Sequence, residues 1–119
     1  MGLDPVALVV SYHKALNRYD AEEVKRFFAP DARYLSPGVN GAIAGRDAII
    51  AAFSAYFAEH PDQHAVDESI VALNPCAARS VWRLAATSTS TGEAYERRGT
   101  ETVTFDESGL IVSVVVEDQ

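Results

Sequence analysis

The stretch from Glu93 to Glu117, EAYERRGTETVTFDESGLIVSVVVE, decides the fold class of this chain. Side chains alternate between two faces from Glu93 to Phe105, as they do along a β-strand whose faces meet different environments. Asp106 to Gly109 is a turn, and Leu110 to Glu117 is a second strand. This last strand places Val112, Val114 and Val116 on one face, and Ile111 and Val115 on the other. We therefore predict an antiparallel hairpin here.

Two further strands are predicted before this hairpin. Gln63 to Leu73 is rich in β-branched residues, and Ala77 to Ser88 alternates between apolar and polar positions. One face of the second of these strands carries Ala78, Ser80, Trp82 and Leu84. The second half of the chain therefore predicts a sheet.

Helical patterns fill the first half of the chain. Apolar residues recur at intervals of three and four across 5–19 and across 46–59. A shorter helix begins at Asp20 and is stopped by Pro30, and a short strand at 32–36 precedes a loop at 37–41. Helices followed by strands predict the α+β class. A bent sheet that receives the helices leaves a cone, and the open end of a cone is a pocket.

Composition and charge narrow the classes of function. The 119 residues suit a single domain, which we assign to 1–119. Ten Lys and Arg against 17 Asp and Glu give a net charge of −7, which disfavours nucleic acid as a partner. The chain has no apolar run long enough to cross a membrane and no signal-peptide pattern at its N-terminus, so we expect a cytoplasmic protein. A single cysteine, Cys76, predicts no internal disulfide.

Glu101 is the most informative polar residue. It shares a strand face with Val103 and Phe105, so the pattern points it toward the interior. A buried carboxylate must be paired or protonated, because desolvation opposes its charge. A protonated acid in an apolar site can donate a hydrogen bond to an oxyanion. Alternatively, Glu101 pairs with Arg97 on the same face, or a bulge leaves it in solvent.

Aromatic residues are the candidates for the wall of a pocket. Tyr12 lies on the apolar stripe of the first helix and would present a phenol to the interior. Further candidates, each of which also suits a packed core, are Tyr34, Phe53, Phe57 and Trp82. Val116 and Asp118 continue the inner face of the last strand, although Asp118 is close enough to the C-terminus to be solvated.

We expect no metal site and no cofactor. His60 and His64 flank Pro61, which breaks helical geometry, and His13 has no partner at the spacing of a metal site. The chain has no glycine-rich phosphate loop.

Four stretches, in their order and spacing, resemble the NTF2-like superfamily, in particular its SnoaL-like and ketosteroid isomerase-like branch. They are 12–20 (YHKALNRYD), 28–37 (FAPDARYLSP), 44–53 (AGRDAIIAAF) and 102–112 (TVTFDESGLIV). The resemblance implies three helices on a strongly bent, mostly antiparallel sheet, a conical cavity, and a homodimer through the outer sheet face. The threonines of 100–104, with Ile111 and Val115, suit such a face. The superfamily includes isomerases, cyclases, hydratases, epoxide hydrolases and pocket proteins without known chemistry.

The resemblance also implies roles for individual residues. Ketosteroid isomerases use a tyrosine and a protonated aspartic acid as an oxyanion hole, and a second aspartate as the base. In that pattern Tyr12 is the helical tyrosine and Glu101 is the oxyanion acid, while Ser36 stands at the position of the base. Serine does not accept a proton at neutral pH without help. The base is therefore unassigned, with Asp118 or water as candidates.

Together these features predict a protein that binds an apolar or aromatic carbonyl-bearing small molecule. Tyr12 and Glu101 would donate hydrogen bonds to the ligand oxygen, and Trp82, Phe53 and Tyr34 would pack on its rings. As an enzyme it would be a cofactor-independent isomerase or cyclase that acts through an enolate. The alternative is a non-catalytic ligand-binding or dimerisation module, with its cavity filled by its own side chains and Glu101 locked in an ion pair with Arg97.

Overall fold

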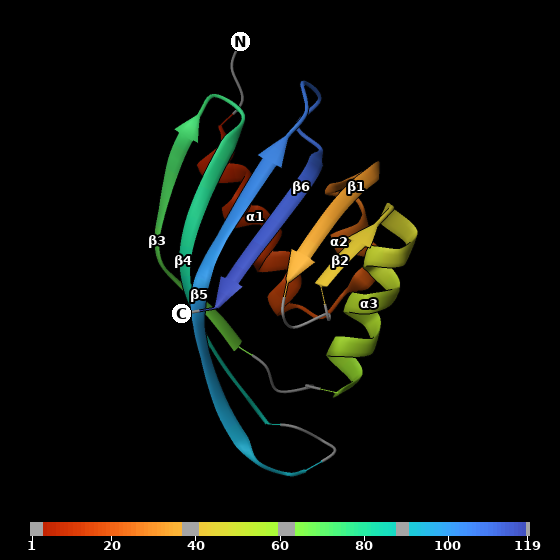
Figure 1. Ribbon diagram of the computed structural model, residues 1–119, viewed down its shortest axis with the longest axis vertical. Coiled ribbons are helices and arrows are strands. Elements are labelled where there is room, and N and C mark those ends of the chain that lie inside the picture. The colour runs from red at the N-terminus through yellow and green to blue at the C-terminus, as the bar shows by residue number, and fades with distance from the viewer. Residues whose placement is uncertain (1–3, 37–40, 60–63, 88–90, 119) are drawn as a thin grey trace.

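One mixed, curved sheet forms the body of the molecule (Figure 1). The computed structural model describes residues 4–36, 41–59, 64–87 and 91–118. Its elements are α1 (Pro5–Asn17), α2 (Ala21–Lys25), β1 (Phe28–Ser36), β2 (Gly41–Ala44), α3 (Arg46–Glu59), β3 (His64–Asn74), β4 (Ala77–Thr87), β5 (Ala94–Phe105) and β6 (Ile111–Asp118). The six strands lie in the order β2-β1-β6-β5-β4-β3, and β1 with β6 is the parallel pair. The α+β prediction is confirmed.

The helices begin and end where local chemistry dictates. Asp4 caps α1 by accepting a hydrogen bond from the amide of Ala7 at 3.1 Å, and Asp20 caps α2 in the same way. α1 ends at Asn17, before the predicted limit, and Tyr19 then adopts a φ of 57°. α1 packs across β3, β4 and β5, whereas α3 packs on β1 and β2. This arrangement leaves the concave face of the sheet between the two longer helices.

We predicted that Pro30 stops the second helix, but it lies inside strand β1, which begins at Phe28. The pairing of β1 with β6 is irregular between Phe28 and Arg33, so the missing N–H of Pro30 interrupts no regular ladder there. Gly41–Ala44 forms strand β2 at the end of the predicted loop. The rest of that loop, 37–40, lies outside the described residues, as does Pro61.

The last strand departs from simple alternation at one residue. Phe105 pairs with Ile111 and Thr104 pairs with Ser113, so the intervening Val112 has no residue opposite it. Such a bulge changes which face the neighbouring side chains occupy. Ile111 is therefore fully buried together with Val114. The prediction that Val112 shares the face of Val114, with Ile111 on the other face, is wrong. Ile111 cannot belong to the outer face on which the predicted dimer would form.

The predicted alternation of β4 and β5 is confirmed. Ala78, Ser80, Trp82 and Leu84 are buried, and their exposed neighbours point to the other side. On β5 the buried side carries Gly99, Glu101, Val103 and Phe105. Register places Ser80 opposite Glu101 and Trp82 opposite Gly99, so an acid and an indole enter the same interior. None of the helices in the described ranges is long and apolar enough to cross a membrane.

Candidate functional site: an acid–imidazole–acid cluster in an apolar cavity

A cavity of about 100 Å³ opens between α1, α3 and the concave face of the sheet. Its walls are largely apolar and aromatic, and several of the predicted ligand-binding residues lie on them: Tyr34, Ser36, Phe53, Trp82 and Val116. Glu101 also lines it, together with His13 and Asp67. The cavity therefore combines a wall suited to rings with a compact cluster of ionisable groups.

His13 lies between two carboxylates. Its Nδ1 is 2.7 Å from Oδ2 of Asp67, and its Nε2 contacts Oε1 of Glu101. The three side chains are mostly buried, with 14%, 22% and 7% of their surfaces exposed for His13, Asp67 and Glu101. They come from α1, β3 and β5, so the cluster exists only once the helix has docked across the sheet.

The two carboxylates determine the charge of His13. Burial alone would lower the pKa of this imidazole, but the charge of Glu101 and the hydrogen bonds to Asp67 and Glu101 outweigh it and raise the pKa to about 10. At neutral pH His13 is an imidazolium, and both of its N–H groups donate. Glu101 is thus an acceptor in this geometry, where the sequence led us to expect a neutral donor. The ion partner that the structure gives it is His13.

His13 has a signal in the sequence, although we predicted no role for it there. It is four residues after Val9 and three before Leu16, so it lies on the same face of α1 as those apolar residues. A titratable side chain on a buried helical face is a candidate for a functional or paired group. Asp67 had no comparable signal, because only the docking of α1 on β3 brings it to His13.

Three predicted site residues do not line the cavity or cannot be placed in it. Tyr12 is fully buried beneath it, and within the described residues its hydroxyl has no hydrogen-bond partner. Burial raises the pKa of Tyr12 well above its usual value, and Glu101 and Tyr34 add to this. Phe57 stacks on Phe53 with 6.1 Å between ring centroids and supports the wall from behind. Asp118 pairs with Gly99 through the backbone, and its side chain lies outside the described residues.

Tyr34 and Tyr56 each bring a phenol hydroxyl to the lining of the cavity, and Tyr34 is the more buried of the two. The ring of Tyr34 meets Phe53 edge-on at 5.2 Å between centroids. Burial and the charge of Glu101 raise its pKa, while Arg97 lowers it in part. The net increase keeps the phenol protonated at neutral pH, so it remains a hydrogen-bond donor.

The cluster does not have the arrangement of a metal site. Both imidazole nitrogens face carboxylate oxygens, so neither is directed at a shared central ion. In the part of the chain that the structure describes, no group of three or more His, Cys, Asp or Glu residues is arranged to hold a metal.

Both the sequence and the fold of this chain are similar to those of known proteins. The sequence profile of the SnoaL-like domain matches residues 9–114. The structure is similar to that of RV0760c from Mycobacterium tuberculosis in complex with estradiol-17β-hemisuccinate, with 20% identity, a TM-score of 0.83, and coverage of 96% of this chain and 93% of that one. A search of the curated proteins found no significant match.

Two further similar structures are enzymes. The Δ5-3-ketosteroid isomerase from Mycobacterium sp. has 18% identity and a TM-score of 0.81 over 97% of this chain and 93% of that chain. The epoxide hydrolase/cyclase-like enzyme SalBIII, of pyran ring formation in the polyether salinomycin, has 15% identity and a TM-score of 0.84 over 95% and 88%. At these identities the likeness establishes the fold. The profile match over 9–114 shows that the chain belongs to the SnoaL-like family.

Proposed function

We propose that this protein binds a flat, apolar molecule carrying a carbonyl group, and that Glu101 removes a proton from the carbon beside that carbonyl. The supporting observation is a carboxylate that lines an apolar cavity and is held from behind by a cation on another element. The similar structures are named for a complex with a steroid ester, for ketosteroid isomerisation and for a ring closure, and this chemistry is of the kind proposed here.

The chemical step uses the two oxygens of Glu101 differently. Oε1 accepts a hydrogen bond from His13, which fixes the carboxylate, and Oε2 takes the proton from the substrate carbon. The C–H bond breaks, an O–H bond forms on Glu101, and the electron pair moves onto the carbonyl oxygen as an enolate. In an isomerisation the proton then returns from Glu101 to another carbon. In a cyclisation the enolate carbon attacks a second carbonyl group, and the alkoxide that forms takes the proton back from Glu101.

Tyr34 is the donor that we assign to the enolate oxygen. It lines the cavity, whereas Tyr12, to which the family resemblance gave that role, is buried outside the lining. A neutral phenol in a desolvated site stabilises developing negative charge without having to be reorganised. Ser36 also lines the cavity, but the base in this account is Glu101 on β5.

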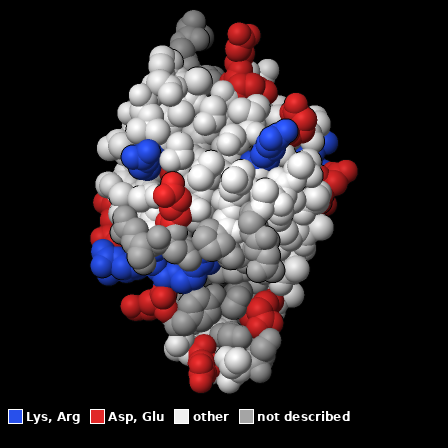
Figure 2. Space-filling view, viewed as in Figure 1, with Lys and Arg blue, Asp and Glu red and all other residues white. Residues whose placement is uncertain are grey.

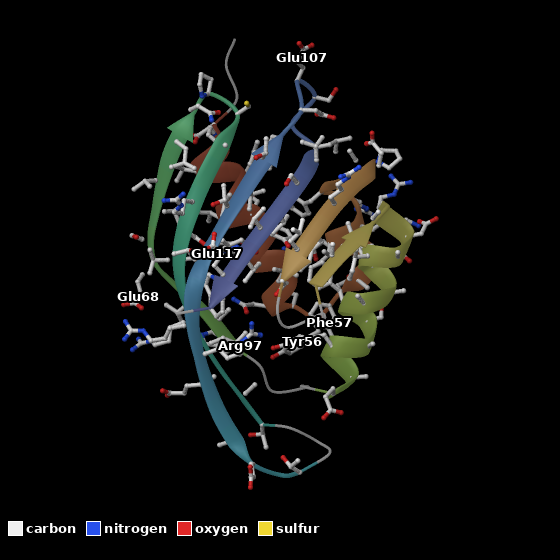
Figure 3. The ribbon with its side chains drawn as sticks, viewed as in Figure 1. Tyr56, Phe57, Glu68, Arg97, Glu107 and Glu117 are labelled. Carbon is white, nitrogen blue, oxygen red and sulfur yellow. The ribbon has the colours of Figure 1, made fainter. Side chains whose placement is uncertain are left out.

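The test is turnover of a Δ5-3-ketosteroid, followed by the absorbance of the conjugated enone. We expect Glu101→Gln to reduce the rate about 100-fold or more, because the side-chain amide of glutamine is not basic enough to take a proton from carbon. Glu117→Gln is the matched control, since Glu117 (labelled in Figure 3) is exposed on the neighbouring strand β6, where it pairs with Thr100 on the face away from Glu101. Equal rates for the two variants, with both folded by circular dichroism, would remove the proposed role of Glu101.

A non-catalytic binding module is the second candidate. It is favoured by the same cluster, because an imidazolium between two carboxylates also neutralises buried charge without any reaction. This candidate predicts that estradiol quenches the fluorescence of Trp82 while no ketosteroid is turned over at any pH. The first candidate predicts both binding and turnover.

Assembly as a homodimer through the outer sheet face remains part of the proposal. Thr100, Thr102 and Thr104 lie on the face of β5 opposite Glu101, and the exposed side of the sheet carries few charges in the view of Figure 2. Ile111 is excluded from this surface because it is buried in the core. Light scattering of the purified chain would distinguish a dimer of about twice the chain mass of 12.9 kDa from a monomer.

A further inference from the structure

Asp67 is a charged group of the cavity that the proposed reaction does not use. It lines the cavity, and 22% of its side chain is exposed, compared with 7% for Glu101. Its Oδ2 accepts a hydrogen bond from Nδ1 of His13 at 2.7 Å. Within the described residues, its other oxygen, Oδ1, accepts no hydrogen bond. The fold therefore uses one oxygen of this carboxylate and leaves the second one at the cavity wall.

A bulge in β3 brings Asp67 to the inner face of the sheet. Asp67 pairs with Trp82 of β4, and the register then shifts before Ser69, so the intervening Glu68 has no residue opposite it. Strict alternation would put Asp67 and Ile70 on opposite faces, but the extra residue lets both face inward, and Ile70 packs on the core. Bulges re-aim side chains in this way and are common beside functional sites. Strand β3 thus keeps its apolar contact with the core and also presents an acid to the cavity.

One imidazolium holds both carboxylates of the cavity. His13 donates one ring N–H to Asp67 and the other to Glu101, so each carboxylate keeps a second oxygen. Among the described residues that line the cavity, the two acids, Asp67 and Glu101, are balanced by two cations, His13 and Arg97. The lining therefore has no excess of negative charge to attract a cationic ligand. A neutral donor, a hydroxyl group, is the partner that suits the second oxygen of Asp67.

The wall around Asp67 favours a hydrogen-bond donor that is carried by the ligand. The neighbouring cross-strand pair on the same face, Ala65 with Leu84, is apolar, and both residues line the cavity. A hydroxyl group bound to a carboxylate forms a charge-assisted hydrogen bond, which is stronger than one between neutral groups. A site that binds a ligand hydroxyl in this way discriminates against an analogue that lacks it. Asp67 can therefore determine which apolar ketones the cavity prefers.

We propose that Asp67 accepts a hydrogen bond from a hydroxyl group of the ligand, so that the ligand of this cavity is a hydroxylated ketone. Its carbonyl oxygen lies at Tyr34, its acidic C–H at Glu101, and its hydroxyl at the second oxygen of Asp67. This inference rests on the proposed function for the reacting end, and it adds a second polar group to the ligand. Asp67 binds and orients the ligand in this account and takes no proton from carbon.

The experiment compares ring-hydroxylated 2-tetralones with their methyl ethers in calorimetric titrations of the whole chain. The ether keeps the ring system and the ketone but has no O–H donor. The isomers that carry the hydroxyl at each position of the aromatic ring are all measured, because the orientation of the ligand decides which position meets Asp67. We expect the unsubstituted protein to bind at least one isomer about tenfold more tightly than its ether.

Substitutions on β3 separate the hydrogen bond from the added bulk of the ether. In Asp67→Asn the amide oxygen is used by His13, and the amide nitrogen donates equally to a hydroxyl and to an ether oxygen. The preference should therefore fall below about twofold, while the affinity for 2-tetralone itself changes by less than about twofold. Glu68→Gln is the matched control, because Glu68 (labelled in Figure 3) is the next residue and pairs with Arg98 at 3.0 Å. It should retain the whole preference.

Three results would overturn the inference: no preference of the unsubstituted protein for any hydroxylated isomer over its ether, a preference that survives in Asp67→Asn, or no binding of any of these ketones. The first and third need no variant, so they decide the matter even if Asp67→Asn does not fold. Glu101→Gln removes proton abstraction but leaves Asp67 in place, so the preference should survive in it. If the unsubstituted protein exchanges no C–H hydrogen and yet prefers the hydroxyl through Asp67, the ligand class stands and the reaction does not.

Discussion

The imidazole Nδ1 of His13 lies 2.7 Å from the carboxylate of Asp67, although 54 positions separate the two residues in the sequence. The contact joins α1 to β3, and the other nitrogen of the same ring joins α1 to Glu101 on β5. One side chain therefore ties the first helix to two strands and fixes the acid that we propose as the base. Substitutions in this cluster should change the stability of the fold and its pH dependence, and a substitution in the cavity wall should change the fluorescence of Trp82.

The contribution of His13 to stability should depend on pH. Its pKa in the folded protein, about 10, is above the ordinary value of 6.5 that applies in the unfolded chain. The stabilisation is therefore complete below pH 6.5 and is lost as the pH rises to about 10. It amounts to at most about 5 kcal/mol. Urea unfolding should give a higher free energy of unfolding for the unsubstituted protein than for His13→Gln, and this difference should decrease steadily across this pH interval. A difference that stays constant would contradict the charged state assigned to His13.

Removing the charge of Asp67 should weaken the cluster without removing its shape. In Asp67→Asn the amide oxygen can still accept the Nδ1–H, so we expect a loss of about 1–3 kcal/mol in the free energy of unfolding. The pH interval over which His13 stabilises the fold should also move downward, because one of the groups that raise its pKa is gone.

Glu68→Gln is the control for this prediction. Glu68 is the next residue along β3, but it pairs on the surface with Arg98, so its substitution should cost less than about 1 kcal/mol. It should also leave the pH dependence unchanged. Equal effects of the two substitutions would argue that Asp67 is an ordinary surface acid.

Gly99→Ala should disturb the cavity wall. The added methyl group has no room beside Trp82 and the backbone of Glu117, so we expect a loss of about 1–3 kcal/mol in stability. The chain has a single tryptophan, and its fluorescence spectrum therefore reports on this site alone. We expect the emission maximum to shift as the indole moves. Thr100→Ala, on the opposite face of β5, should leave the spectrum unchanged, and an unchanged spectrum in Gly99→Ala as well would refute the packing described here.

The faces of β4 and β5 could be predicted from the sequence because alternation is a local property of a strand. Alternation alone groups Gly99 with Glu101 on one face of β5, and Trp82 with Leu84 on one face of β4. The bulge at Val112 could not be predicted in this way, because it depends on how β6 aligns with β5 and not on the composition of β6 itself. Strand β2 was likewise missed, since its four residues form a strand by pairing with β1.

The site was only partly accessible to the same reasoning. An acid on the inner side of a strand signals a partner or a shifted ionisation, which drew attention to Glu101. The identity of that partner depends on the angle at which α1 crosses the sheet, and this angle brings His13 to the carboxylate. The spacing of the three histidines argues against a metal set, but it carries no information about His13 as an ion partner. Its place on an apolar helical face is the local feature that could have indicated such a role.

The most direct test of the central claim is the exchange of the acidic C–H hydrogens of 2-tetralone for deuterium in D₂O, followed by proton NMR. This measurement reports the proposed proton abstraction whatever rearrangement follows it. The account predicts that the unsubstituted protein and Glu117→Gln accelerate exchange, and that Glu101→Gln, folded and able to bind the ketone, does so about 100-fold less. Exchange at the same rate in Glu101→Gln, or no acceleration by the unsubstituted protein, would contradict it.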